Sequence, residues 1–136
     1  MTKINIPETG LKRVVIIGAG FAGLELAKRL ADDEIQVVLI DKNNYHQFQP
    51  LFYQVATAGL EPSSIAFPLR KLFQNKKNIY IRVASVECIE PEQKRILTSL
   101  GTCWYDELVI ATGADTNYYG NEKIERYAIP MKSVSE

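Results

Sequence analysis

The sequence predicts an α/β fold in which a parallel sheet is flanked by helices and carries a small antiparallel β-meander. Two short apolar runs, residues 14–17 and 37–40, are typical of strands buried on both faces of a parallel sheet. Between them, apolar and charged residues recur with a helical period, as a strand–helix–strand unit requires. Later β-rich segments, 79–86, 95–98, 102–105 and 108–111, predict the remaining strands, the last of them buried.

Glycines follow the first apolar run at the spacing G-x-G-x-x-G, formed by Gly18, Gly20 and Gly23. The first glycine permits a tight turn, the second lets backbone approach a pyrophosphate, and the third lets the helix lie close to the strand. The N–H groups and dipole at the helix start favour a phosphate. The motif predicts a Rossmann-like dinucleotide site.

Asp41 ends the second apolar run, about twenty residues past the glycines. Its carboxylate can accept hydrogen bonds from ribose hydroxyls and would repel a 2′-phosphate, which disfavours an NADP-type ligand. FAD and NAD both fit this pattern. The alternative is a helix that only packs tightly, with Asp41 a solvated strand end; this explains Gly23 but not Gly18 and Gly20 together.

Composition excludes several classes of function. Sixteen basic residues balance sixteen acidic ones among 136, so no net charge favours nucleic acid. The longest uncharged window of the first motif is too short to span a bilayer, and the start lacks a signal peptide. We interpret residues 1–11 as a flexible leader, residues 12–13 as part of a solvated face, and the chain as cytoplasmic.

Cys88 and Cys103 belong to no metal-like cluster, so we expect two free thiols and no metal site. His46 is the only histidine, and taken alone it is expected on the surface. Residues 41–60 have no clean period and are expected to cover the far end of the nucleotide; alternatively, the aromatic residues at positions 48, 52 and 53 cap the core. A packing helix is expected around Pro68, and no element after Ala114.

Three patterns occur in one order: VVIIGAGFAG at 14–23, NYHQFQPLFYQVA at 44–56 and YDELVIATGA at 105–114. Together they resemble the two-dinucleotide-domain flavoprotein oxidoreductases and, within them, the type II NADH dehydrogenases, which are non-proton-pumping NADH:quinone oxidoreductases. The first and last patterns are shared by the whole superfamily, and the middle one is more specific. The resemblance implies that residues 12–136 are the N-terminal part of an FAD-binding domain.

The resemblance also implies where FAD lies. The glycines meet the pyrophosphate, Asp41 the adenosine ribose and the backbone at Val86 the adenine, while residues 49–50 approach the flavin and residues 112–113 close over the cofactor. The full set of implied cofactor residues is Gly18, Gly20, Phe21, Ala22, Gly23, Asp41, Lys42, Gln49, Pro50, Val86, Ala111, Thr112 and Gly113. No side chain is expected to act as a catalytic acid or base.

In the parent enzyme so implied, NADH passes a hydride to FAD, and two electrons then reach a quinone. The parent is expected at the cytoplasmic face of the inner membrane, held as a peripheral protein by a segment absent here. We expect this chain to be a truncated fragment, with the native chain continuing past Glu136, and to be inactive, weak in FAD binding and prone to self-association.

Two alternatives stay open. A sulfide:quinone or ferredoxin-type reductase has the same architecture, but sulfide chemistry needs cysteines near the flavin, and Cys88 and Cys103 fall in the expected meander. The chain could also act as a stand-alone, non-catalytic nucleotide-binding module.

Overall fold

The computed structural model describes residues 2–133 and divides the chain into two units. The first unit combines residues 1–46 with 68–112, and the second combines residues 47–67 with 113–136. Residue 1 of the expected leader and residues 134–136 of the expected domain lie outside the described residues. None of the described helices is long and apolar enough to cross a bilayer.

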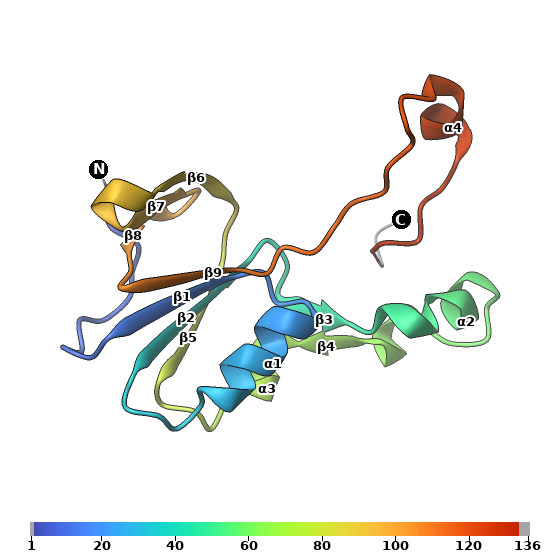
Figure 1. Cartoon of the computed structure of the whole chain (residues 1–136). Coiled ribbons are helices and arrows are strands. Elements are labelled where there is room, and N and C mark those ends of the chain that lie inside the picture. Colours follow the sequence, from blue (N-terminus) through green and yellow to red (C-terminus); the bar gives the residue numbers. More distant parts are fainter. Residues whose placement is uncertain (1, 134–136) are drawn as a thin grey trace. The chain divides into compact units, whose positions relative to one another are not determined.

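A four-stranded parallel sheet in the order β5-β2-β1-β9 forms the centre of the first unit (Figure 1). Its strands are β1 (Arg13–Ile17), β2 (Gln36–Asp41), β5 (Ile79–Val83) and β9 (Glu107–Ile110). Helix α1 (Phe21–Arg29) connects β1 to β2, and the short helix α3 (Leu69–Leu72) precedes β5. The predicted α/β class with a parallel sheet is confirmed.

The central strands β1 and β2 each contain four consecutive apolar residues, at 14–17 and 37–40, because both faces of the sheet are covered. On one face, strand residues pack with both helices in a cluster of Val14, Ile16, Ala19, Leu24, Ala27, Val37, Leu39, Leu69, Phe73, Ile79 and Ile81. On the other face, the alternate strand residues pack in a cluster of Ile4, Ile6, Val15, Ile17, Val38, Ile40, Ala84, Ile96 and Cys103. This two-sided burial holds the carboxyl ends of β1 and β2, where the glycine turn begins, in a rigid frame.

The antiparallel meander covers the second face. It consists of β6 (Val86–Glu90), β7 (Arg95–Thr98) and β8 (Gly101–Trp104), with the 3-10 turn η3 (Pro91–Gln93) between β6 and β7. The prediction of a small antiparallel β-meander is therefore confirmed. The expected third strand over 79–86 is divided, since its first part joins the parallel sheet and its last residue begins β6.

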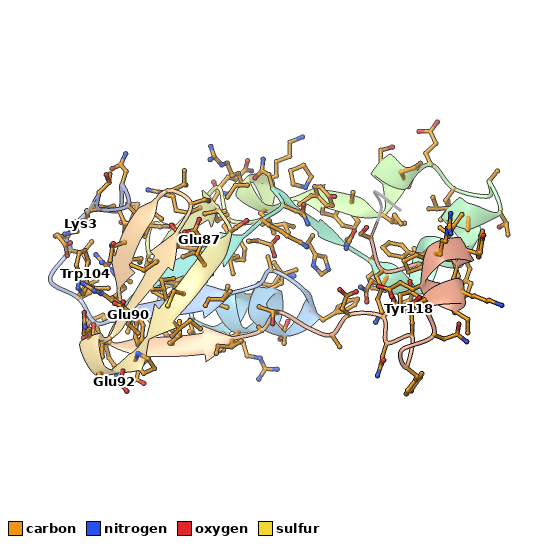
Figure 2. All side chains as sticks on the ribbon, turned by 90° about the horizontal axis from the view of Figure 1, so that it is seen from above. Lys3, Glu87, Glu90, Glu92, Trp104 and Tyr118 are labelled. Atoms are coloured by element: carbon orange, nitrogen blue, oxygen red, sulfur yellow. The ribbon has the colours of Figure 1, made fainter. Side chains whose placement is uncertain are left out.

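The N-terminal segment differs from the expected flexible leader. Ile4 and Ile6 are only 3% and 5% exposed, and the N–H of Ile4 donates to the carbonyl of Thr102 in β8 at 3.0 Å. The Lys3 ammonium lies 5.7 Å from the centroid of the Trp104 ring, at the end of the meander (Figure 2). The chain bends at Asn5, where the N–H of Ile6 donates to the carbonyl of Ile4 at 2.9 Å, and both isoleucines pack into the core.

Arg13 is buried, although it was expected on a solvated face. Its guanidinium donates to the side-chain oxygen of Gln36 at 2.6 Å and to the carbonyl oxygens of Pro7 and Trp104 at 3.3 and 3.4 Å. This network joins the N-terminal segment, the parallel sheet and the meander, and a buried cation needs such acceptors.

Replacing Arg13 by alanine should lower the free energy of unfolding by about 2–3 kcal/mol, the range for lost hydrogen bonds to a charged group. The buried amide of Gln36 would lose its guanidinium partner. Urea denaturation followed by circular dichroism measures the change. Lys12→Ala is the matched control, because Lys12 is exposed and forms only a surface ion pair with Glu107. Equal transition midpoints for the two variants would contradict this account.

The remaining differences lie in short elements. The connection after β2 contains regular structure, namely β3 (Tyr45–Gln47), η1 (Gln49–Leu51), α2 (Phe52–Ala56), η2 (Pro62–Ser64) and β4 (Ala66–Pro68). A further helix, α4 (Glu122–Tyr127), follows Ala114 and is capped by the Asn121 side chain, which accepts from the N–H groups of Lys123 and Ile124. Elements this short show no periodicity in sequence.

Two expectations of burial were wrong. Strand β9 exists, but Ile110 is 62% exposed, since β9 is an edge strand with a partner on one side only. The aromatic residues of the connection do not all cap a core, because Phe52 is 7% exposed whereas Phe48 and Tyr53 are 38% and 68% exposed. The helix expected around Pro68 begins there but ends at Leu72.

The two cysteines are free thiols in different surroundings. Cys88 is exposed, whereas Cys103 is buried and its burial raises the pKa of the thiol. Since the thiolate is the reactive form, iodoacetamide at mildly alkaline pH should modify Cys88 rapidly and Cys103 only after unfolding. Peptide mass spectrometry after a short labelling pulse measures both rates. Comparable rates in the native chain would contradict the packing of β8.

Candidate functional site

The turn between β1 and α1 requires glycine at its first and third positions. Gly18 has φ of +100°, and an added Cβ would lie 2.4 Å from the carbonyl oxygen of Ala111. A Cβ on Gly23 would lie 1.8 Å from the carbonyl oxygen of Gly18. Real atoms do not approach this closely, so both glycines are needed for α1 to fold back against the end of the sheet.

Gly20 is different, because the described chain does not require glycine there. Its φ is −70°, which any residue adopts, and an added Cβ would have no neighbour within 4 Å. The residue is exposed and forms the N-cap of α1 without a capping side chain, and the first turn of α1 contains no acidic residue. The positive end of the helix dipole therefore faces a space that a phosphate could fill.

Asp41 lies beside this turn at the end of β2. Its Oδ2 accepts a hydrogen bond from the N–H of Ala19 at 2.7 Å, and its Oδ1 accepts from the N–H of Asn43 at 2.7 Å. A carboxylate offers about four lone-pair positions, so these two bonds leave capacity for ribose hydroxyls. Asp41 is half-buried, and the structure excludes the alternative that it is a purely solvated strand end.

Two further predicted residues, Ala111 and Thr112, directly follow β9 and lie beside the turn. The N–H of Ala111 donates to the carbonyl of Ile17 at 2.8 Å, which continues the β1–β9 pairing beyond the strand. Its own carbonyl lies against Gly18. Thr112 follows and is exposed, so its hydroxyl is available to a ligand at this edge.

Lys42 and Val86 lie at the same end of the sheet. Lys42 follows Asp41 directly and is exposed. The N–H of Ala84 donates to the backbone carbonyl of Asp41 at 2.9 Å, and Val86 begins β6 two residues later. The backbone at Val86 is therefore near the carboxyl end of β2.

The other three predicted residues belong to the second unit. Gln49 and Pro50 are exposed in η1, and the side-chain N–H of Gln49 donates to the carbonyl of Lys132 at 3.1 Å. Gly113 has φ of +72°, a left-handed conformation that favours glycine, and an added Cβ would meet nothing within 4 Å. Gly113 follows Thr112 and begins the second segment of this unit.

His46 is a residue of this site that the sequence analysis missed. It is 7% exposed, in contrast to the expected surface position, and its Nδ1 bonds the carbonyl oxygen of Ala19 at 2.9 Å. Its ring meets the ring of Phe21 edge-on, with centroids 5.3 Å apart. The only sequence signal is its position five residues after Asp41, at the end of the sheet where ligands of open α/β folds bind.

Comparison with protein families agrees with this geometry. Residues 12–131 match the model of the pyridine nucleotide-disulphide oxidoreductase family. The chain belongs to this family. Similar proteins include a type II NADH:quinone oxidoreductase of Mycobacterium tuberculosis, 37% identical over 131 residues that cover 93% of this chain. A mitochondrial external alternative NAD(P)H-ubiquinone oxidoreductase of Arabidopsis thaliana is 32% identical and covers 96% of it.

Solved structures of oxidoreductases share the fold. NDH2 of Plasmodium falciparum in complex with NADH superposes with a TM-score of 0.82 at 23% identity, covering 91% of this chain and 27% of that one. The sulfide:quinone oxidoreductase of Aquifex aeolicus has a TM-score of 0.71 at 32% identity, covering 79% and 25%. The expected resemblance to type II NADH dehydrogenases is confirmed, and the chain spans 28% and 25% of the mycobacterial and plant relatives.

Proposed function

We propose that this chain is the FAD-binding part of an NADH:quinone oxidoreductase. The observation that supports this most directly is the open space at Gly20. The fold itself would tolerate a Cβ there, whereas a pyrophosphate lying on the backbone would clash with one. The names of the mycobacterial and plant relatives supply the reaction class.

The residues present fit the ADP half of FAD. The backbone at Gly20 and the start of α1 would hold the pyrophosphate, and Phe21 and Ala22 would border it. The free lone pairs of Asp41 would accept hydrogen bonds from the adenosine ribose. The carboxylate disfavours a 2′-phosphate at this position.

The remaining assignments concern the rest of the cofactor. We place the adenine beside the backbone at Val86, with Lys42 near the ribose. Ala111, Thr112 and Gly113 would close over the dinucleotide. Gln49 and Pro50 would approach the flavin ring.

When bound, FAD would accept a hydride from NADH and deliver two electrons to a quinone. The chain's own part is to bind and orient the cofactor and to exclude water from it. Its side chains supply no acid or base to the reaction. Because the quinone is in the membrane, we place the parent enzyme as a peripheral protein at the cytoplasmic face of the inner membrane.

Donor preference tests this proposal. The full-length product of the gene, purified with FAD, should reduce a soluble quinone with NADH as donor and not with sulfide. The sulfide alternative is favoured by the 32% identity to the Aquifex aeolicus enzyme, but both cysteines belong to the meander, with Cys103 buried in β8 and Cys88 exposed in β6. Quinone reduction by sulfide and not by NADH would overturn the proposal in favour of that alternative.

The isolated chain should self-associate through β9. This edge strand leaves backbone groups unpaired on one side, and Ile110 is 62% exposed. Light scattering should show a mass that rises with protein concentration, and Ile110→Lys should shift the chain toward monomer. A clean monomer that retains stoichiometric FAD would contradict both self-association and weak cofactor binding.

A further inference from the structure

We propose that His46 is a positioning residue for the diphosphate-binding turn. Together with Asp41, it holds the two peptide groups of Ala19 by one hydrogen bond each and so sets the direction of the Gly20 N–H. This inference rests on the proposed function, because it assigns that N–H to the pyrophosphate of FAD.

The clamp consists of two hydrogen bonds to one buried residue. Ala19 is 2% exposed; its N–H donates to Oδ2 of Asp41 at 2.7 Å, and its carbonyl oxygen lies 2.9 Å from Nδ1 of His46. Asp41 is the last residue of β2 and His46 the middle residue of β3, so both partners come from the chain that passes the turn (Figure 1). Ala19 cannot rotate either peptide plane without breaking one of these bonds.

The direction of the neighbouring groups follows from peptide geometry. In a planar trans peptide, the C=O and the next N–H point in opposite directions. Because the Ala19 carbonyl points at His46, the Gly20 N–H points away from His46. Gly20 is exposed, and the space beside its Cα is open within 4 Å.

The same rule accounts for the other side of the turn. The Ala19 N–H points at Asp41, so the Gly18 carbonyl must point the other way. It does point toward α1, since a Cβ added to Gly23 would lie 1.8 Å from the Gly18 oxygen. Asp41 therefore orients the Gly18 carbonyl toward α1, and His46 orients the Gly20 N–H that remains for a ligand.

The bond to Ala19 also defines which imidazole nitrogen carries a hydrogen. A carbonyl oxygen only accepts, so Nδ1 of His46 must carry the hydrogen. The ring is held edge-on to Phe21 with an angle of 82° between the planes, which orients Nδ1 toward the turn. This role needs a donor at the Nδ1 position and makes no use of Nε2.

A set of three variants tests this role. Asn places its amide N–H at the position of Nδ1, Gln places its amide one atom farther from Cβ, and Leu has no donor. His46→Leu and His46→Gln should weaken ADP binding about tenfold, the order expected for one misdirected hydrogen bond, and His46→Asn should restore most of the affinity. Calorimetric titration with ADP measures the affinity, and thermal unfolding without ADP separates it from stability.

Two spectroscopic readouts do not depend on ADP. The Gly20 amide resonance should shift in His46→Leu and return toward the wild-type position in His46→Asn. In the wild-type chain, imidazole nitrogen shifts should show hydrogen on Nδ1. Hydrogen on Nε2 alone would overturn the clamp even if every variant failed to fold.

A failure of the proposed function and a failure of the positioning role of His46 give different results. If the wild-type chain binds no ADP, the proposed function fails, and the clamp is decided by the two spectroscopic readouts. If ADP binds but all three variants bind it as the wild type does, the positioning role is overturned. Equal losses of affinity in His46→Asn and His46→Leu also overturn it, because they show that the imidazole acts by packing alone.

Discussion

Gly23→Ala is expected to destabilise the first unit by about 3 kcal/mol, at the upper end of the range for overpacking a core. The added Cβ would lie 1.8 Å from the Gly18 oxygen and 3.2 Å from Cγ2 of Ile16. The first contact is with backbone, which cannot rotate away as a side chain can. Helix α1 would have to move off the sheet, which would expose the buried side chains of Leu24 and Ala27.

Urea denaturation and the thermal midpoint measure this loss. Gly20→Ala is the matched control in the same turn, because its Cβ meets nothing within 4 Å and its φ is −70°. We expect the control to unfold with the wild type to within about 1 kcal/mol. A Gly23→Ala chain as stable as the control would mean that α1 does not lie against Gly18 as the structure shows.

Gly20→Val is expected to leave the fold intact and to reduce the affinity for ADP by about a hundredfold, which corresponds to ~2.7 kcal/mol. A β-branched residue suits the extended backbone of this position, where ψ is −165°. Its side chain would occupy the space in which we place the pyrophosphate.

Calorimetric titration with ADP measures this effect, and thermal unfolding shows whether the fold is retained. Glu25→Val provides a control with the same introduced side chain on the exposed face of the same helix, and it should bind ADP as the wild type does. Unchanged affinity in Gly20→Val would show that the diphosphate does not contact this turn.

Gly23→Ala is expected to affect stability and Gly20→Val to affect ADP binding, although sequence alone assigns both glycines to one motif. The spacing of Gly18, Gly20 and Gly23 predicts the turn correctly, because a strand followed by a helix this close leaves few ways to connect them. Only coordinates distinguish the glycines that the fold requires from the one that it does not. Gly20 is thereby identified as the position where open space, and not the fold, accounts for the glycine.

The parallel sheet was predictable because β1 and β2 are buried on both faces and so contain four consecutive apolar residues each, at 14–17 and 37–40. The run in β9 looks the same in sequence, yet Ile110 is 62% exposed, since an apolar run does not show whether a strand has one neighbour or two. The burial of the N-terminal segment was not predicted, because its apolar pattern is too weak. Ile4 and Ile6 carry a two-residue period too short to be distinguished from chance.

His46 could not be placed from sequence, because its bond to Ala19 depends on the path of the chain between β2 and β3. Its separation from Asp41 is short, but a loop of that length can return in many directions. The buried Arg13 is a similar case, since its acceptors include carbonyl oxygens at positions 7 and 104. Contacts to backbone carbonyls leave no pattern in the side chains.

The most direct test of the central claim is a titration of the isotope-labelled chain with ADP, followed by amide resonances. The account predicts saturable shifts concentrated at Gly20, Ala22, Gly23 and Asp41, with little change in strands β7 and β8, which contain none of the proposed cofactor residues. No saturable shift, or shifts concentrated in β7 and β8 and absent from the glycine turn, would contradict it.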